Sequence, residues 1–267
     1  MKHKNLYFLK LGGSVITHQN IENSADMLEI SRLLKEVKSG IGDFDLVLGH
    51  GSGSFGHIAS NRYNLAAGFT NIQSRIGTSI AQDVHAKLHR IVIERMLDFK
   101  MLPSSFAPSN CALTKKGKII SWNLGPIKQS LDLGFIPVTY GDIILDREKG
   151  VSDLSTEEVF RFLGQKLRPS KIIVGTNIDG LYTGDPNLNK DAELVREVNR
   201  GNIKKVLKFA GGSRKIDTTG GMRSKLLSLY ETSRVSGAEC YIVNAKKKNR
   251  VYDILRGKKG DWTRICY

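Results

Sequence analysis

The sequence predicts an α/β protein, a three-layer αβα sandwich with a central, mostly parallel sheet. Two observations support this prediction. Apolar segments of strand length alternate with stretches in which apolar residues recur at helical spacing. Most glycine clusters lie close to an expected strand end or helix start, where the backbone can approach a ligand or take positive φ. With 267 residues the chain can bury a sizeable core, and we expect one domain with two lobes.

The expected elements begin with a strand at 6–11, a glycine turn and a helix whose apolar residues start at Met27. A second strand at 45–49 leads into another glycine-rich turn and a long helix marked by apolar residues from Ile76 to Ile91. Further strands are expected at 136–140, 171–176 and 239–243, and further helices near 124–133, 155–167, 202–209, 221–235 and 249–256.

Two local signals refine this outline. Ser155 and Glu158 have the spacing of a capping box, so a helix should begin there, with its free N–H groups facing the crevice at the sheet's carboxyl edge. The stretch 184–200 is the least regular and contains turn chemistry, so we expect a surface excursion.

The charge balance is strongly basic. Lysine and arginine number 41 against 26 acidic residues, a formal charge of +15, so nucleic acid has to be considered as a partner. Much of this charge lies in short runs at 115–118, 246–250 and 256–259 that are typical of solvated turns. Aromatic residues are only 7% and no aromatic-rich basic strand is evident, so we do not expect nucleic-acid binding.

Cysteine usage and the N-terminal segment indicate a cytoplasmic protein. Cys111, Cys240 and Cys266 are widely separated, which gives neither a disulfide framework nor the ligand spacing of a protein-bound metal. Lys10 interrupts the apolar run 6–9 before a signal-peptide core or a membrane span could form. We therefore expect a soluble, unexported protein with no membrane partner.

The glycine-rich turns predict phosphate binding, but not by the two commonest motifs. Gly51-x-Gly53-x-x-Gly56 matches a dinucleotide fingerprint, yet positions 67–79 hold neither the acidic residue nor the strand that such a site needs. No Gly-x-x-x-x-Gly-Lys-Ser/Thr loop is present, which excludes a P-loop. Two glycine turns leaving neighbouring parallel strands could instead present backbone N–H groups to two phosphates, as phosphoryl transfer requires.

Three side chains near these turns are candidates for the chemistry. Lys10 lies in an apolar strand, where a lysine is costly unless it has an anionic partner or reaches water. Lys225 lies early in an expected helix, where a bound anion would offset its repulsion by the helix dipole. His57 could donate to an acceptor phosphate in either protonation state, or could simply be a structural histidine.

Five motifs in sequence order resemble those of the amino acid kinase superfamily, and the histidine after the second glycine turn resembles the isopentenyl phosphate kinase branch. The motifs span most of the chain. They are Lys10-Leu11-Gly12-Gly13-Ser14, His50-Gly51-Ser52-Gly53-Ser54-Phe55-Gly56-His57, Gly141-Asp142-Ile143-Ile144-Leu145-Asp146, Thr176-Asn177-Ile178-Asp179-Gly180-Leu181-Tyr182-Thr183 and Thr219-Gly220-Gly221-Met222-x-x-Lys225.

The resemblance implies a single amino acid kinase domain at 1–267, with an acceptor-binding lobe at 1–168 and a nucleotide-binding lobe at 169–267. It also implies a homodimer that uses ATP and Mg²⁺ to phosphorylate a small phosphomonoester, most simply isopentenyl phosphate. Because such an acceptor is already an anion, no general base is needed, and catalysis should consist of positioning and charge neutralisation.

The resemblance further implies a role for each motif residue. Lys10 and Lys225 would neutralise the transferring phosphoryl group, and Glu157 would orient these lysines. The backbone of four residues would cradle that group: Gly12, Gly13, Ser14 and Ser52. The acceptor phosphate would contact Gly51, Gly53, Gly56, His57 and Thr156. The nucleotide pocket would include Thr176, Asp179, Gly180, Tyr182, Gly220 and Gly221.

Two departures from the family pattern leave the acceptor open. Gln19 stands where these kinases usually carry a further lysine, and Thr156-Glu157 replaces their Gly-Asp. One alternative is a related kinase acting on a phosphonate such as fosfomycin, and another is a catalytically inactive nucleotide sensor. Ile76, Ile80 and Val84 would favour a prenyl acceptor if they lined its pocket, although their helical spacing also suits a plain core.

Overall fold

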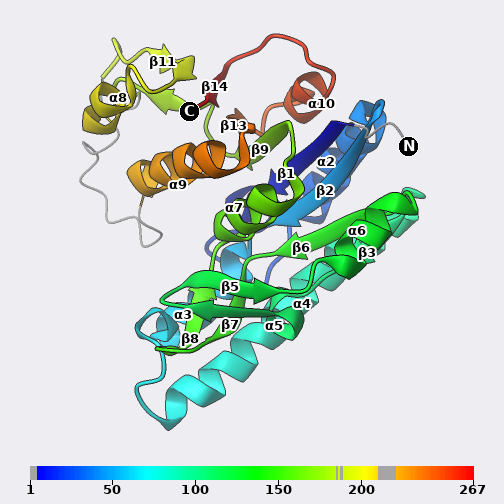
Figure 1. Ribbon diagram of the computed structural model, residues 1–267, viewed down its shortest axis with the longest axis vertical. Helices are drawn as coiled ribbons and strands as arrows, with labels where there is room; N and C mark the ends of the chain where they lie inside the picture. Colours follow the sequence, from blue (N-terminus) through cyan, green and yellow to red (C-terminus); the bar gives the residue numbers. More distant parts are fainter. Residues whose placement is uncertain (1–4, 185, 187–188, 210–220) are drawn as a thin grey trace.

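The computed structural model describes residues 5–184, 186, 189–209 and 221–267, and it has the expected α/β class (Figure 1). The strands of the main sheet are β1 Asn5–Leu11, β2 Phe44–His50, β3 Pro103–Ser105, β6 Ile136–Tyr140, β9 Lys171–Thr176, β12 Glu197–Val198, β13 Glu239–Asn244 and β14 Trp262–Ile265. They lie in the order β12-β14-β13-β9-β1-β2-β6-β3, and all neighbours are parallel except the pair β13–β14.

The helices cover both faces of this sheet, as the alternating pattern predicts. They are α1 Gly13–Ile16, α2 Met27–Gly40, α3 Gly53–Arg62, α4 Ile72–Asp98, α5 Pro108–Cys111, α6 Gly125–Asp132, α7 Thr156–Leu167, α8 Ile203–Phe209, α9 Gly221–Ser236 and α10 Arg250–Leu255, with a short 3-10 helix η1 at Leu65–Ala67. Figure 1 shows α2 and α10 on one side of the central strands and α7 and α9 on the other. Each expected helix and strand is therefore found within a few residues of its predicted position.

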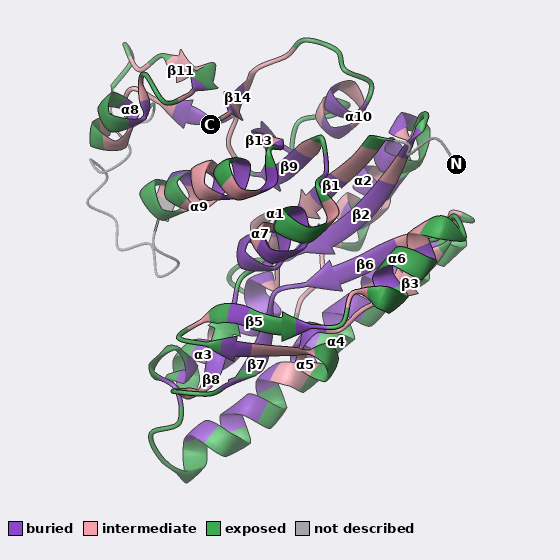
Figure 2. Cartoon of the chain, in the orientation of Figure 1, coloured by how far each residue is buried: buried purple, intermediate pink, exposed green. Residues whose placement is uncertain are grey.

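Two hydrophobic clusters, one on each face of the main sheet, form the core. Leu9 and Leu11 of β1 pack with residues of α2, α4 and α10, whereas Phe8 packs with residues of α7 and α9. Successive strand residues point to opposite faces, so Lys10 projects to the same side as Phe8, towards α7. Figure 2 shows the central strands buried along most of their length.

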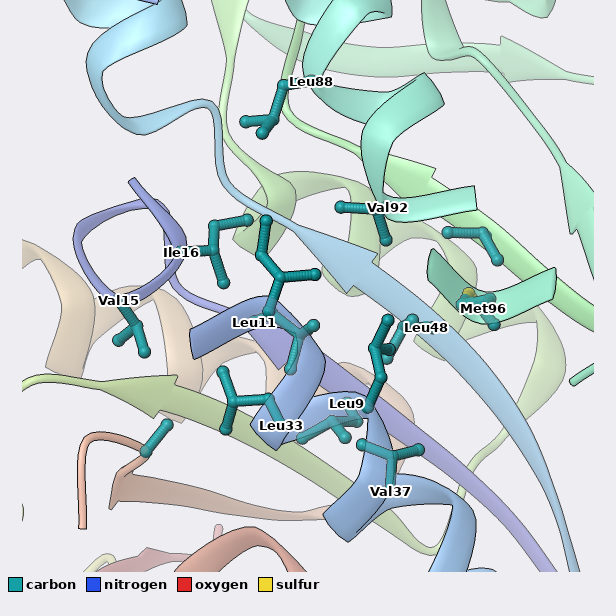
Figure 3. Close-up of a cluster of buried hydrophobic side chains, with 14 of the residues drawn as sticks. Leu9, Leu11, Val15, Ile16, Leu33, Val37, Leu48, Leu88, Val92 and Met96 are labelled. Atoms are coloured by element: carbon teal, nitrogen blue, oxygen red, sulfur yellow. The ribbon is translucent and has the colours of Figure 1, made fainter. Parts of the chain in front are cut away.

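The first glycine turn is anchored in this core. Val15 and Ile16 of α1 are fully buried beside Leu11, as Figure 3 shows. Gly12 has no room for a side chain, because an added Cβ would lie 2.4 Å from the backbone oxygen of Gly175 in β9. Apolar packing therefore fixes the position of the turn, and its own backbone remains at the edge of the sheet.

A second, four-stranded sheet was not expected from the sequence. Its strands are β4 Ala112–Lys115, β5 Lys118–Trp122, β7 Asp142–Asp146 and β8 Gly150–Leu154, in the order β5-β4-β7-β8. These strands are short and carry charged residues, so their apolar pattern is weak. Asp146 holds them together by accepting backbone N–H groups of Gly117, Glu148 and Lys149.

The stretch 184–200 is more regular than predicted. Besides β12 it contains β11, Leu194–Val195, which pairs antiparallel with β10, Leu181–Tyr182. Two-residue strands leave almost no periodic signal, and sequence reasoning missed them for that reason.

The predicted start of α7 is confirmed in detail. Ser155 is the N-cap, and its hydroxyl accepts a hydrogen bond from the backbone N–H of Glu158 at 3.2 Å. The Glu158 carboxylate does not complete the box. It binds Lys118 and Arg161 instead, and so joins α7 to β5.

Candidate functional site

A cleft of about 530 Å³ lies at the carboxyl ends of β1, β2 and β9. It brings together residues that are far apart in the sequence, including most of the predicted site. Its lining is Lys10, Gly12, Gly13, Ser14, Gly51, Ser52, Gly53, His57, Ser60, Asn61, Ala66, Gly141, Asp153, Leu154, Ser155, Thr156, Glu157, Val174, Gly175, Thr176, Met222, Ser224, Lys225 and Ser228. The roles predicted for these residues remain predictions, but a shared cleft is their first requirement.

The two glycine turns touch each other at the floor of this cleft. Leu11 and His50 are register partners in the parallel pair β1–β2, and the Gly51 N–H donates to the Leu11 carbonyl at 2.9 Å. A Cβ on Gly13 would lie 2.3 Å from the backbone nitrogen of Gly53. Glycine is therefore required for the close approach of the two turns, which can hold two phosphates side by side.

Lys10 has the anionic partner that its position in an apolar strand predicts. Its ammonium donates to the Glu157 carboxylate at 2.5 Å, and both side chains are about nine-tenths buried. Burial tends to raise the pKa of Glu157, but the charges of Lys10 and Lys225 and the bond from Lys10 together lower this pKa to about 2. Glu157 is therefore ionised at neutral pH, and it links two cations from opposite ends of the chain.

The N-terminus of α7 faces the cleft beside this ion pair. Ser155, Thr156 and Glu157 line the cleft, so the first backbone N–H groups of the helix lie where they could bind an anion. Thr156 is almost fully buried, and its hydroxyl donates to the His50 carbonyl at 2.7 Å. The threonine that replaces the family's glycine thus ties α7 to the last residue of β2.

The remaining predicted catalytic residues come from two helices on opposite sides of the cleft. His57 is the fifth residue of α3 and is exposed towards the cleft. Lys225 is the fifth residue of α9 and lines the same cleft. Gly56 does not line it, but packs against the ring of His85 behind the turn.

The predicted nucleotide residues separate into two groups. Thr176 lines the cleft, and its hydroxyl donates to the Ile178 carbonyl at 2.9 Å. Asp179, Gly180 and Tyr182 lie outside the cleft lining. The Tyr182 hydroxyl donates to Asp179 at 3.1 Å, and Lys247 forms an ion pair with Asp179 at 2.8 Å. Gly221 begins α9, whereas Gly220 lies outside the described residues.

The cleft lining does not include the three apolar residues of α4 for which a prenyl-pocket role and a plain core role were both open. Ile76 and Ile80 are 45% and 38% exposed, and Val84 is buried in the core, so none of the three lines the cleft. Gln19 is also exposed and lies outside the lining.

Sequence reasoning missed the polar residues near His57. Ser60, Asn61 and Asp153 line the cleft, and the Ser60 hydroxyl donates to the Asp153 carboxylate at 2.6 Å. Ser60 and Asn61 belong to α3, one turn beyond His57, so the helical period could have indicated them. Asp153 comes from β8, in the sheet that the sequence did not predict.

A group of buried histidines behind the second glycine turn was also missed. His50 and His89 share a hydrogen bond of 3.0 Å between ring nitrogens, and His89 binds Ser105 at 2.7 Å. Burial lowers the pKa of both rings, that of His89 to about 4, so both are neutral at pH 7. His85 and His89 are one turn apart on α4, a spacing that could have revealed their common side.

The part of the chain that the structure describes contains neither a candidate metal cluster nor a candidate membrane-spanning helix. No group of three histidine, cysteine or acidic residues there could hold a metal ion. None of its helices combines the length and apolar character needed to cross a bilayer.

Comparisons with known proteins agree with the fold and the motifs. A sequence profile of the amino acid kinase family matches residues 5–244. The isopentenyl phosphate kinase of Methanothermobacter thermautotrophicus is 30% identical, covering 97% of this chain and 98% of its own. That of Thermoplasma acidophilum is 32% identical, covering 93% and 96%.

Solved structures give the same result. A solved structure of an isopentenyl phosphate kinase superposes with a TM-score of 0.84 at 28% identity, and the match covers 97% of this chain and 99% of that one. The uridine monophosphate kinase of Ureaplasma parvum, at 13% identity and a TM-score of 0.71 over 99% of this chain and 100% of its own, shares the fold.

Fold, cleft and relatives together define the class: a phosphotransferase that uses ATP. The chain belongs to the amino acid kinase family, and its resemblance to the isopentenyl phosphate kinases is confirmed.

Proposed function

We propose that this protein transfers the terminal phosphoryl group of ATP to isopentenyl phosphate. The observation that carries the proposal is the cleft in which two touching glycine turns are flanked by Lys10, Lys225 and His57. Relatives named isopentenyl phosphate kinase that match over nearly the whole chain support this acceptor.

In the proposed reaction, an oxygen of the acceptor phosphate attacks the γ-phosphorus of ATP in line, and the bond from that phosphorus to the β-phosphate oxygen breaks. The products are ADP and a diphosphate, and no proton needs to be removed from the acceptor. Lys10 and Lys225 balance the charge on the oxygens around the transferring group. Glu157 holds Lys10 in place, and His57 donates to the acceptor phosphate.

The backbone completes the proposed site. Gly12, Gly13, Ser14 and Ser52 would present N–H groups to the transferring group, and the start of α7 would face the same anion. Nucleotide binding is assigned to the lobe at 169–267, which contains Thr176 and Asp179, and acceptor binding to the lobe at 1–168.

Mg²⁺ fits this arrangement as a cofactor that arrives with ATP. Among the described lining residues, the carboxylates are Asp153 and Glu157, and Glu157 is bound to Lys10. Such a site suits a metal held chiefly by phosphate oxygens and water, which is the usual mode for magnesium in kinases. When bound, it would neutralise charge on the phosphates.

A homodimer in the cytoplasm is the proposed working state. Ile72, Ile76 and Ile80 are spaced four residues apart on α4, and all three are exposed. An apolar stripe of this kind on a helix surface is suited to burial against a second copy of the chain.

A phosphonate with a small polar tail is the second candidate acceptor. The side of the cleft near His57 includes the polar residues Ser60, Asn61 and Asp153, beside Ala66 and Leu154. A polar wall of this kind favours a compact acceptor such as fosfomycin over a prenyl chain.

Direct measurement of ADP release tests these proposals. The purified protein is incubated with Mg-ATP and, separately, with isopentenyl phosphate, dimethylallyl phosphate or fosfomycin. We expect the highest kcat/KM with isopentenyl phosphate. A higher value with fosfomycin would select the second candidate, and no ADP with any acceptor would contradict both and favour a nucleotide sensor.

A further inference from the structure

His85 is a buried side chain that the proposed reaction does not use. It is 2% exposed, and its Nδ1 lies 3.4 Å from the carboxylate of Asp142, which is fully buried. Asp142 also accepts the backbone N–H groups of Ile143 at 2.8 Å and Ser109 at 3.0 Å. A carboxylate that accepts two N–H groups favours the tautomer with its proton on the facing Nδ1, and in that tautomer Nε2 is an acceptor.

This Nε2 has no hydrogen-bond partner among the residues that the structure describes. An unsatisfied buried acceptor is costly, so its direction is informative. The point where a Cβ on Gly56 would lie is 2.1 Å from His85 Nε2 and 2.3 Å from Ser52 Oγ. The ring nitrogen and the hydroxyl are therefore close neighbours across Gly56, and any residue other than glycine there would separate them.

Ser52 has an unusual hydroxyl for its position. It immediately precedes α3, where a serine commonly caps the helix, but its side chain makes no capping hydrogen bond. The residue itself lines the cleft between the two glycine turns. Ser52 thus joins the cleft on one side to the His85–Asp142 pair on the other.

We propose that His85, oriented by Asp142, accepts a hydrogen bond from the Ser52 hydroxyl when the acceptor phosphate is bound. This inference rests on the proposed function, because it assigns the second glycine turn to the acceptor. Such a bond would fix the glycine turn that contains Ser52 and lines the cleft. His85 is therefore a positioning residue that acts through Ser52, not a group that contacts the substrate.

A double-mutant cycle with Ser52→Ala, His85→Leu and their combination tests the pairing. One such bond corresponds to roughly a three- to tenfold change in an equilibrium constant. We expect each single variant to raise the KM for the phosphate acceptor by about that factor and the KM for ATP by clearly less, because only one N–H of this turn is assigned to the group that ATP carries. The double variant should be no worse than either single one, because the same bond is lost.

The matched control is Gln82→Leu. Gln82 lies one turn before His85 on α4 and donates to the Ile143 carbonyl of β7 at 2.7 Å. Its replacement therefore perturbs the packing of α4 against β7, as His85→Leu does, but does not affect Ser52. We expect an unchanged acceptor KM. Effects of Ser52→Ala and His85→Leu that multiply, or that raise the KM for ATP equally, would overturn the proposal.

A second measurement does not depend on the folding of His85→Leu. In ¹⁵N-histidine NMR spectra of the wild-type protein, addition of the acceptor should move the Nε2 resonance of His85, and Ser52→Ala should abolish this movement. The same response in Ser52→Ala would exclude the pairing. Failure of the proposed function is distinguishable, since it would appear as no ADP release by the wild-type enzyme with any acceptor.

Discussion

Replacement of Lys10 by methionine separates its structural role from its proposed catalytic role. The pKa of Glu157 is lowered from 4.5 to about 2, which corresponds to about 3 kcal/mol at ~1.4 kcal/mol for each pH unit. The sign follows from the lowered value: this stabilisation is fully present above pH 4.5 and is lost as the pH falls towards 2. Lys10→Met leaves a carboxylate that is 8% exposed without its hydrogen-bonded cation.

Loss of one partner from a buried ion pair costs roughly 3–5 kcal/mol, and Lys225 still offsets part of the charge, so we expect about 3 kcal/mol. Urea unfolding at pH 7 measures this change. Lys10→Met combined with Glu157→Gln should regain most of the lost stability, because no buried charge is left unpaired. Both variants should nevertheless lose roughly 10²- to 10³-fold in kcat for ADP formation.

Lys118→Met is the matched control. Lys118 also donates to a buried carboxylate, that of Glu158 at 3.0 Å, but its own side chain is 65% exposed and lies outside the cleft. It should cost between 0 and about 1 kcal/mol and leave kcat unchanged. Normal turnover in the folded double variant would refute the assignment of Lys10 to the transferring phosphoryl group.

Three further predictions concern other parts of the molecule. His57→Ala should unfold like the wild-type protein in urea but lose roughly 100-fold or more in kcat/KM for the acceptor, and unimpaired turnover would show that the acceptor site is misplaced. Glu36→Ala should lower stability by roughly 3 kcal/mol with normal kcat, because the buried carboxylate accepts the N–H groups of Asn249 and Val251 at the start of α10; a change below 1 kcal/mol would contradict this. His89, with its pKa lowered to about 4, should make stability fall as the pH drops from 6.5 to 4, since the unfolded chain binds a proton that the native ring resists; His89→Gln should flatten that dependence in unfolding curves.

The order of the main helices and strands could be predicted because the local spacing of apolar residues indicates each of them. The strand at 171–176 contains the apolar run 172–174, and the helix at Thr156–Leu167 has both a cap and an apolar stripe. The four-stranded sheet could not be predicted in the same way. Asp146 joins the end of β7 to the turn between β4 and β5 by accepting the N–H groups of Lys116 and Gly117, about thirty residues earlier in the chain. No local sequence pattern indicates a contact between residues so far apart.

The site residues also divide into those with a local sequence signal and those that only the fold brings together. Glycine turns at strand ends carry their own signal, since close backbone approach demands the residue type. The pairing of Lys10 with Glu157 has no such local signal, because 147 residues separate the two. Only the family resemblance indicated this pairing. The exposure of Ile76 and Ile80 was equally hidden, since helical spacing shows that residues share a face but not what that face meets.

The two residues that depart from the family pattern at the start of α7 act as one unit. Glu157 has a longer arm than aspartate, and its carboxylate reaches Lys10 at 2.5 Å. Thr156, in place of glycine, bonds the His50 carbonyl and so fixes the helix end from which that arm extends. His50 in turn precedes Gly51, where the second glycine turn starts. Thr156 and Glu157 therefore couple the ion pair of Lys10 to the second glycine turn through a single hydroxyl group.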